Sequence, residues 1–559
     1  MRKILKIILL TLLGIPVLLL LVPLCIGTYL YCTADFLQPD VSVHLEECGL
    51  VIENDSVRRC TNGHLIMNKH GHWEAYLSGN AVERGSAYGL LSKDLLKYQE
   101  DVFVNQIHEI IPSEWWVEFL HKVIIVFNRD MGTHIPMELR EEIYAMSLSC
   151  SDEHNAYGSP YVRQLNYHAA HDIGHAMQEY MLVGCSSFAV WDEESVTGDL
   201  LVGRNFDFYV GDRFAENKVI LFVEPTEGYK FASVSWPGMM GVLSGMNERG
   251  LTVTINAAKG ALPLSSAMPI SLLTRQILQY ASTIDEAYEI AKQYKTFVSE
   301  SILVGSANEN SAAVIEKTPE QIALYRSSDN KLICTNHYQS EEFAEDEYNK
   351  DNIATSDSPY RYERLNELIS ETSPIDKDDA AFILRNRYGI GNEDIGIGNE
   401  KSINQFIAHH SVIFQPGELR MWVSSSPWQL GEYVCYDMNE VFNDTCARPA
   451  SYALCVHNIP MDSSLVENEY VRITRYRTQF TEIRETIDEG GQLSTDYIEQ
   501  FINNNPRYFQ TYNIIGDYME SINHPQQAVG YWEKALSLEI PRMGEREEIQ
   551  NKINDYDKK

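Results

Sequence analysis

The chain has 559 residues, of which 44% are apolar and 22% charged, and this composition excludes a disordered chain, a collagen-like repeat and a polytopic membrane protein. Its 79 acidic and 45 basic residues give a formal net charge of −34, which disfavours binding to nucleic acid. At ~150 residues per domain, the length allows three or four domains.

Residues 1–34 are typical of a membrane anchor or a signal segment. Arg2, Lys3 and Lys6 precede an uncharged run from Ile7 to Ala34. As a helix, Ile7–Tyr31 would be roughly 37 Å long, which is enough to cross a bilayer. The basic residues ahead of it predict a cytoplasmic N-terminus, with the rest of the chain in the periplasm or at the cell surface. A cleaved signal peptide is the alternative, although the apolar run is long for one.

Three regions follow the anchor. Residues 35–184 contain a predicted strand at Trp73–Leu77, a glycine-punctuated turn at Gly79–Gly89, and helices. Residues 185–464 carry mostly short β-type runs, interrupted by one long predicted helix at Ile270–Tyr294, which is typical of a layered α+β domain.

Residues 465–559 form a predicted helical tail. Within it, Tyr512–Pro541 resembles one tetratricopeptide unit. A single unit of this kind cannot bury its own apolar face. The tail is therefore expected either to pack on the preceding region or to bind a protein partner, and an ordinary helical hairpin is an equally open interpretation.

The residues with chemical potential gather around Gly184-Cys185. The runs Leu182–Trp191 and Leu200–Phe208 flank a turn signal and predict a β-hairpin. An antiparallel hairpin returns the end of its second strand to the start of its first, so Cys185 should meet Arg204 and Asp207. A neighbouring guanidinium should stabilise the thiolate. The structural alternative is a buried cysteine beside a surface Arg–Asp pair.

Two asparagines end strands predicted further along the chain. Asn256 closes the run Leu251–Asn256, and Asn336 follows Leu332–Thr335. Amides at strand ends can donate N–H groups into a common pocket, as a developing oxyanion requires.

These motifs, in this order, resemble the N-terminal-nucleophile cysteine hydrolases, and in particular the acyl-CoA:6-aminopenicillanic acid acyltransferase family. The choloylglycine hydrolases and the acid ceramidase-like amidases are more distant. The resemblance covers roughly residues 70–425 and rests on Gly79–Gly89, Gly184-Cys185, Gly203–Asp207, Gly245–Gly250, Thr335–His337 and Ser358–Arg361. It implies a four-layer αββα sandwich and a chain that cuts itself between Gly184 and Cys185.

The resemblance also implies roles for three residues of the hairpin. Cys185, once freed at its amino end, would attack an amide carbonyl through its sulfur. Its own α-amine, with a pKa near 7.7–8.0, would act as the base. Asp207 would hydrogen-bond that amine, and Arg204 would hold the thiolate and the substrate.

The remaining roles fall on residues from later elements. Asn256 and Asn336 would stabilise the oxyanion. Arg361 matches the late arginine of the family, and Arg364 is its rival because both follow Ser358.

The sequence therefore predicts a membrane-anchored, self-cleaving amidohydrolase that acts on linear amides of small N-acyl compounds through an acyl thioester. An acyltransferase that uses the same thioester is the close variant. A non-catalytic envelope interaction protein is the alternative of a different class. No cofactor is implied, and the N-terminal fragment is expected to stay as a partner after cleavage.

Two further motifs remain outside this scheme. His168, His171 and His175 share one helical face, but no HExxH pattern accompanies them, so polar packing or contact with the processing site is favoured over zinc. The glycine-rich stretch Tyr388–Glu400 lacks a Walker lysine, which makes a nucleotide site improbable. A flexible loop near the substrate entrance is expected there.

Overall fold

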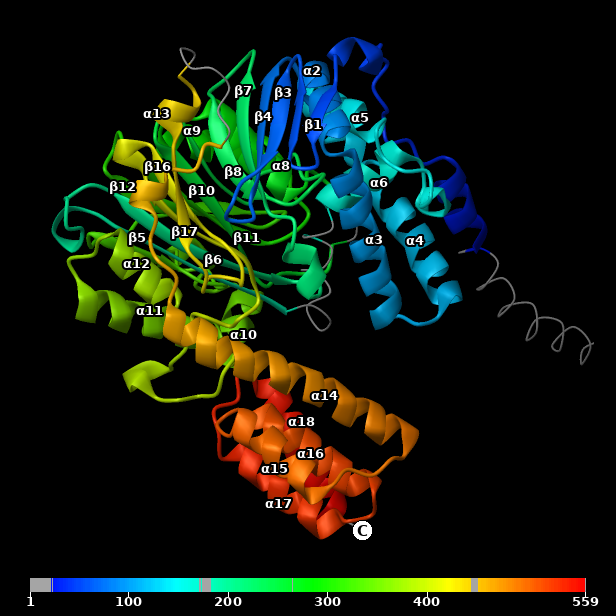
Figure 1. Ribbon diagram of the computed structural model, residues 1–559. Coiled ribbons are helices and arrows are strands. Elements are labelled where there is room, and N and C mark those ends of the chain that lie inside the picture. Colours follow the sequence, from blue (N-terminus) through cyan, green and yellow to red (C-terminus); the bar gives the residue numbers. More distant parts are fainter. Residues whose placement is uncertain are drawn as a thin grey trace, which may run out of the picture.

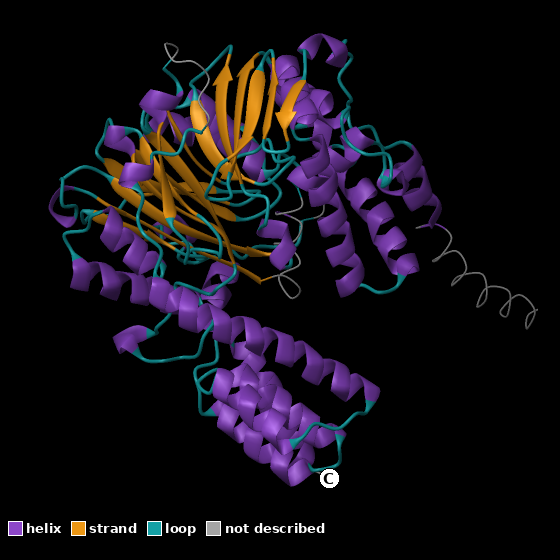
Figure 2. Ribbon diagram, viewed as in Figure 1, coloured by secondary structure: helices purple, strands orange, loops and turns teal. Residues whose placement is uncertain are grey.

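The computed structural model describes residues 22, 24–169, 172, 182–263, 265–443 and 451–557. Two β-sheets lie face to face, and helices cover their outer faces (Figure 2). A separate group of helices forms the C-terminal tail.

The larger sheet has 11 strands, and all of its neighbouring pairs are antiparallel except one. In spatial order the strands are β1 (Val51–Asn54), β2 (Val57–Cys60), β3 (Gly63–Met67), β4 (Trp73–Gly79), β7 (Val219–Pro225), β8 (Phe231–Ser235), β9 (Ser244–Asn247), β10 (Leu251–Ala257), β11 (Glu300–Ser306), β12 (Ser311–Lys317) and β13 (Ile322–Tyr325). The exception is the parallel pair β4–β7, which joins strands from before and after Cys185 in a single sheet (Figure 1).

The smaller sheet has six strands and contains the predicted hairpin. Its spatial order is β14 (Lys331–Cys334), β5 (Leu182–Val190), β6 (Leu201–Tyr209), β15 (Ala408–Gln415), β16 (Arg420–Ser424) and β17 (Tyr433–Asp437). The hairpin prediction is confirmed, because β5 and β6 pair antiparallel with Cys185 opposite Phe206 and Gly184 opposite Asp207.

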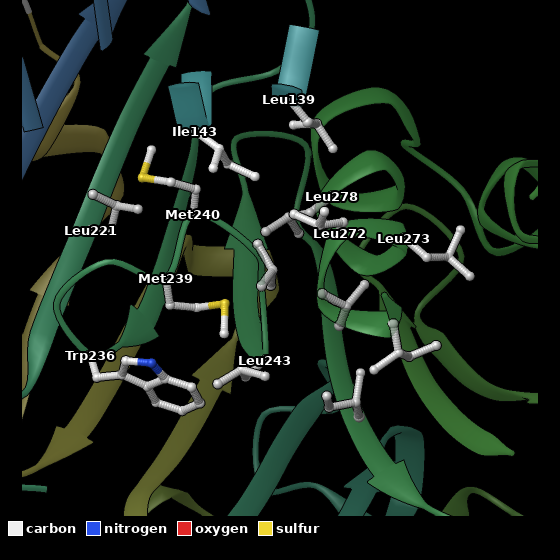
Figure 3. Packing of buried hydrophobic residues seen from close by; sticks show 14 of the residues in the cluster. Leu139, Ile143, Leu221, Trp236, Met239, Met240, Leu243, Leu272, Leu273 and Leu278 are labelled. Carbon is white, nitrogen blue, oxygen red and sulfur yellow. The ribbon is translucent and has the colours of Figure 1, made fainter. Parts of the chain in front are cut away.

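Alternation along the strands separates the apolar side chains into layers. Phe222 and Val234 of the large sheet pack against Val412 and Val423 of the small sheet in the core between them. Residues on the other face of the large sheet pack against helices, and Figure 3 shows part of this cluster. The outer face of the small sheet packs against two further helices in the same way.

Among the described residues before Cys185 lie the helices α2 (Ala81–Leu91), α3 (Lys93–Ile110), α4 (Glu114–Asn128), α5 (Met137–Ser147) and α6 (Pro160–His168). The turn predicted at Gly79–Gly89 is therefore wrong: Asn80 and Glu83 form a capping box that starts α2. The glycines serve packing instead, since a Cβ at Gly85 would lie 2.1 Å from the Glu142 carbonyl oxygen of α5.

The long helix predicted at Ile270–Tyr294 is two helices, α8 (Ile270–Tyr280) and α9 (Ile284–Gln293). The Thr283 side chain accepts a hydrogen bond from the Glu286 amide and caps the start of the second helix. The outer face of the small sheet is covered by α11 (Ser358–Thr372) and α12 (Lys377–Leu384). Two shorter helices are α10 (Glu347–Thr355) and α13 (Met438–Val441).

The tail consists of α14 (Val471–Glu489), α15 (Thr495–Asn504), α16 (Phe509–Ser521), α17 (Pro525–Leu536) and α18 (Met543–Asp557). The predicted tetratricopeptide-like segment corresponds to the pair α16–α17, in which Gly516 lies against the Trp532 ring. The apolar core of the tail also contains Ile397 and Phe406, so the tail packs on the preceding region.

Across the part of the chain described here, no helix is both long and apolar enough to cross a membrane. This finding contradicts the transmembrane helix predicted at Ile7–Tyr31, of which residues 7–21 and 23 lie outside the described residues. It also contradicts the predicted membrane contact and extracytoplasmic location, which depended on that helix.

Candidate functional site

Cys185 lies near the start of β5, on the face of the small sheet that points toward the large sheet. Its side chain is fully buried. Arg204 of β6 lies on the same face, and its Nη2 is 3.6 Å from the Cys185 sulfur. The predicted thiol–guanidinium contact is therefore present.

Several groups fix the orientation of the Arg204 guanidinium. Its Nη1 donates to the Ser244 hydroxyl and, at 3.1 Å, to the Leu243 carbonyl, while Nη2 donates to the Ile255 carbonyl. His410 Nε2 lies 2.8 Å from the Ser244 hydroxyl and 3.4 Å from Arg204 Nη1. The Ser244 hydroxyl therefore links the Arg204 guanidinium to the His410 ring.

The surroundings of Cys185 do not favour a thiolate. Burial raises the pKa of this thiol, and the opposing charge of Arg204 does not overcome the effect. Arg204 therefore does not by itself provide the thiolate expected from the sequence. A nucleophilic sulfur at this position needs a base to take its proton.

Asp207 lies on the opposite face of β6, directly across from Gly184. Its side chain is fully buried, and neither carboxyl oxygen has a hydrogen-bond partner among the described residues. Burial raises the pKa of Asp207 to about 8, against the lowering effect of Arg361 and Arg204. A buried carboxyl with no partner among the described residues is an energetic cost that a positively charged neighbour would offset.

Asn336 and Arg361 hold the backbone of Cys185. The Cys185 amide donates to Asn336 Oδ1 at 3.0 Å. Arg361 Nη1 donates to the Cys185 carbonyl at 2.6 Å, and its Nη2 donates to the same Asn336 oxygen at 2.7 Å. Asp357 in turn accepts from Arg361 Nε at 3.0 Å.

The rival arginine points elsewhere. Arg364 donates to Glu367, Asn386 and Asn392, and no hydrogen bond joins it to Cys185 in the described part of the chain. The structure thus brings Arg361 to Cys185 and directs Arg364 to a neighbouring loop.

The two asparagines differ in the N–H groups they have left to donate. Asn256 Nδ2 donates to the carbonyls of Cys334 and Thr335 at 2.9 and 3.1 Å, which uses both of its N–H groups. Asn336 Nδ2 donates to the Ala257 carbonyl at 2.8 Å, and one N–H group is left over. In this state, of these two residues, Asn336 has the N–H available for an oxyanion.

The histidine series is only partly within the described residues, since His171 and His175 lie outside them. His168 is buried; its Nδ1 donates to the Gln164 carbonyl at 2.7 Å, and its Nε2 accepts from the Met240 amide at 2.9 Å. Burial lowers the pKa of His168 to about 4. Within the described ranges, no group of three potential ligands is placed to hold a metal ion.

One neighbour of the site gave no signal in the sequence. Gln405 precedes β15 in a loop, and a Cβ added at Gly184 would lie 2.7 Å from Gln405 Nε2. The Gln405 side chain therefore lies against the residue before Cys185. It stands in no motif, and only the tertiary fold brings it there.

An aromatic pocket adjoins the site. Phe206, opposite Cys185 in the ladder, stacks on Phe208 and Trp236 with ring centroids 5.6 and 6.5 Å away. Phe208 and Trp236 line the pocket, together with Phe103 of α3 and Phe214.

Residues 191–424 match the family model described as acyl-coenzyme A:6-aminopenicillanic acid acyl-transferase. The predicted resemblance to this family is confirmed for these residues, which begin shortly after Cys185 and include Arg204, Asp207, Asn256 and Asn336.

Among curated proteins, an uncharacterized protein of Archaeoglobus fulgidus is 24% identical over 438 residues, which are 68% of this chain and 70% of that protein. Protein dcd1B of Dictyostelium discoideum is 25% identical over 265 residues, which are 45% of this chain and 51% of the relative. The match thus spans about half the length of the Dictyostelium protein.

The chain is also similar to solved structures at low sequence identity, including the following three. The Caenorhabditis elegans ortholog of N-acylethanolamine-hydrolyzing acid amidase has a TM-score of 0.31 at 16% identity, over 42% of this chain and 93% of its own. A mutant of the conjugated bile acid hydrolase from Clostridium perfringens has a TM-score of 0.32 at 13% identity, over 46% and 93%. Penicillin V acylase from Agrobacterium tumefaciens has a TM-score of 0.33 at 14% identity, over 46% and 87%.

Proposed function

We propose that this protein is a self-processing cysteine amidohydrolase that cleaves linear amide bonds in N-acyl compounds, with Cys185 as its nucleophile. The observation that carries the proposal is the arrangement at the Gly184–Cys185 bond. A buried thiol lies 3.6 Å from Arg204, and a buried carboxyl without described partners lies across the ladder from Gly184.

The first step would be cleavage of the chain itself. The Cys185 sulfur attacks the Gly184 carbonyl carbon, the bond from that carbon to the Cys185 nitrogen breaks, and the nitrogen keeps the proton that the thiol loses. Water then hydrolyses the thioester, which leaves a carboxylate at Gly184 and a free amine at Cys185. Asn336 accepts a hydrogen bond from the Cys185 amide, and Arg361 donates one to its carbonyl. These two bonds would keep Cys185 fixed during the reaction.

The new amine supplies what the uncut site lacks. It can take the thiol proton at neutral pH, whereas an amide nitrogen cannot. In its ammonium form it also gives Asp207 a positively charged partner, which favours the ionised carboxylate. The cost of burying Asp207 in the uncut chain is then offset in the processed enzyme.

The processed enzyme would use the same chemistry on a substrate. The sulfur attacks the amide carbonyl of the substrate, and the amine of the substrate leaves with a proton from the Cys185 ammonium. Water then releases the acid from the thioester. The remaining N–H of Asn336 supports an oxyanion role for this residue, whereas Asn256 would first have to give up a bond to a carbonyl.

Phe206 lies opposite Cys185 and stacks on Phe208 and Trp236, and these rings support an apolar acyl group as the part of the substrate held next to the sulfur. An acyltransferase is the second candidate, because the matching family model carries that description. It differs only in the last step, where an amine instead of water attacks the thioester.

The test is to purify the chain and separate it on a denaturing gel. We expect two fragments, the second beginning with Cys185-Ser186-Ser187, and a single band for Cys185→Ala. A second fragment with any other first residue would refute the assignment of the nucleophile. Release of acid from a panel of N-acyl amides, with and without an added acceptor amine, then separates hydrolysis from transfer.

A further inference from the structure

The helical tail shares its core with a loop of the catalytic region. The buried cluster that joins α14 to α18 also includes Ile397, Phe406 and Leu430, which all precede the tail. The tail lies outside the residues matched by the family model. It is therefore an addition to the matched region that is packed into this protein rather than attached by a linker.

The loop that contains residues 395–406 is fastened to the tail by hydrogen bonds. The side chain of Asn505 bonds both the amide and the carbonyl of Ile397, at 2.9 and 2.8 Å. Asn399 donates to the Glu539 carbonyl at 3.0 Å, and Lys401 pairs with the Glu539 carboxylate at 2.6 Å. Ile397 and Asn399 are buried, so this part of the glycine-rich stretch packs against the tail.

The loop ends in a strained residue that the tail holds in place. Phe406 has a φ of +58°, a left-handed conformation that is unfavourable for a non-glycine residue. Its side chain is fully buried in the core of the tail, and its carbonyl accepts from Arg477 of α14 at 2.9 Å. The ring of Trp428 packs edge-on against it. Such a conformation persists only where the surroundings fix it.

Phe406 directly follows Gln405, whose side chain lies against Gly184. Gln405 is buried, and its Nε2 donates to the Glu400 carbonyl within the same loop at 3.2 Å. A Cβ at Gly184 would lie 2.7 Å from that nitrogen. The backbone direction set at Phe406 thus decides where the Gln405 amide sits beside the Gly184–Cys185 bond.

We propose that the helical tail is a positioning element for self-cleavage, in which Arg477 fixes Phe406 and thereby holds Gln405 against Gly184. The inference rests on the proposed self-cleavage at this bond. Arg477 lies far from Cys185 in the sequence and touches no reacting atom. Besides Phe406 it also faces the Tyr209 ring at 5.7 Å and lies 3.8 Å from Asp212, so the experiment must separate the route through the loop from these contacts. Because reacting atoms must be placed within a fraction of an ångström, loosening this contact should slow cleavage strongly.

The experiment follows the appearance of the second fragment after cell-free synthesis of the full chain. We expect Arg477→Met to slow cleavage about tenfold or more, and Arg477→Lys to restore part of the rate. The matched control is Arg484→Met on the same helix, where the guanidinium lies over the Phe480 ring and the residue is exposed. This variant should cleave at the wild-type rate.

A double-variant cycle distinguishes positioning from general loss of stability. Gln405→Ala leaves the tail intact and should slow cleavage by itself. If Arg477 acts through Gln405, adding Arg477→Met to Gln405→Ala should slow the reaction little further. Independent effects of the two substitutions, or a wild-type rate in Arg477→Met, would overturn the inference. A wild-type chain that remains whole would instead overturn the proposed function, and this inference with it.

Discussion

Asp207 is the residue whose surroundings change most if the chain is cut after Gly184. In the uncut chain it is buried without a described partner, and its pKa is raised to about 8. Between its ordinary pKa of 3.8 and about 8, the folded precursor therefore binds one proton more than the unfolded chain does. The sign follows directly: raising the pH through this window removes stability from the precursor.

We predict that a precursor locked by Cys185→Ala loses about 1.4 kcal/mol of unfolding free energy per pH unit through Asp207 between about pH 5 and 7. Adding Asp207→Asn should remove the part of the pH dependence of the unfolding free energy that Asp207 contributes, because an amide does not ionise. Denaturant unfolding of the single and double variants at both pH values measures the difference. Parallel pH profiles for the two proteins would contradict the raised pKa.

Arg361 and Arg364 allow a controlled comparison of two buried arginines on the same helix. Both are fully buried on α11, but only Arg361 of the two bonds the Cys185 carbonyl and Asn336. A lysine cannot reproduce the forked contact of a guanidinium.

We predict that Arg361→Lys slows self-cleavage by about 10–100-fold, the equivalent of a lost charge-assisted hydrogen bond of about 1.5–3 kcal/mol. Arg364→Lys should lower stability yet leave the cleavage rate within about threefold. Fragment appearance on a gel, read beside thermal unfolding, checks both. Equal slowing in the two variants would mean that the contacts of Arg361 have no special role.

At the scale of elements, local signals predicted the strands that carry the site but not the contacts between helices. The β5–β6 hairpin followed from two apolar runs around a turn, so its register placed Cys185 near Arg204. The glycines of α2 looked like a turn because their purpose, close approach to α5, is visible only once both helices are folded. Gln405 was missed for the same reason, since a tertiary contact leaves no periodicity.

The glycines of α2 support a prediction about packing. Gly85→Ala would place a Cβ 2.1 Å from the Glu142 carbonyl oxygen, so α2 must move away from α5. We expect a net loss of stability even though alanine favours a helix by about 1 kcal/mol. The control is Gly530→Ala in α17, where nothing lies within 4 Å of the new Cβ and a gain is expected. The measurement is the melting temperature of each variant against that of the unsubstituted protein. A higher melting temperature for Gly85→Ala would contradict the close contact between α2 and α5.

At the scale of the whole molecule, a cut at Gly184 would divide the polypeptide without dividing its core. The first fragment contributes β1 to β4 to the larger sheet, and the parallel pair β4–β7 crosses between the fragments. A buried ion cluster also crosses, because Glu142 of α5 bonds Arg84 of α2 at 2.7 Å and lies 3.3 Å from Arg275 of α8. The processed fragments are therefore expected to remain one particle in native buffer.

Arg275 tests how strongly the fragments are joined. Removing one partner of a buried ion cluster costs about 3–5 kcal/mol, because the remaining charge stays buried, so Arg275→Met should clearly lower the denaturant concentration at which the processed fragments separate. Arg326→Met removes an exposed pair with Asp285 and should change this concentration little, since such pairs contribute about 0–1 kcal/mol. Size-exclusion chromatography across a urea series measures both transitions. Fragments that already separate in native buffer would show that the sheet and the ion cluster do not hold them together. Equal shifts of the separating urea concentration in the two variants would show that the buried cluster contributes no more than an exposed pair.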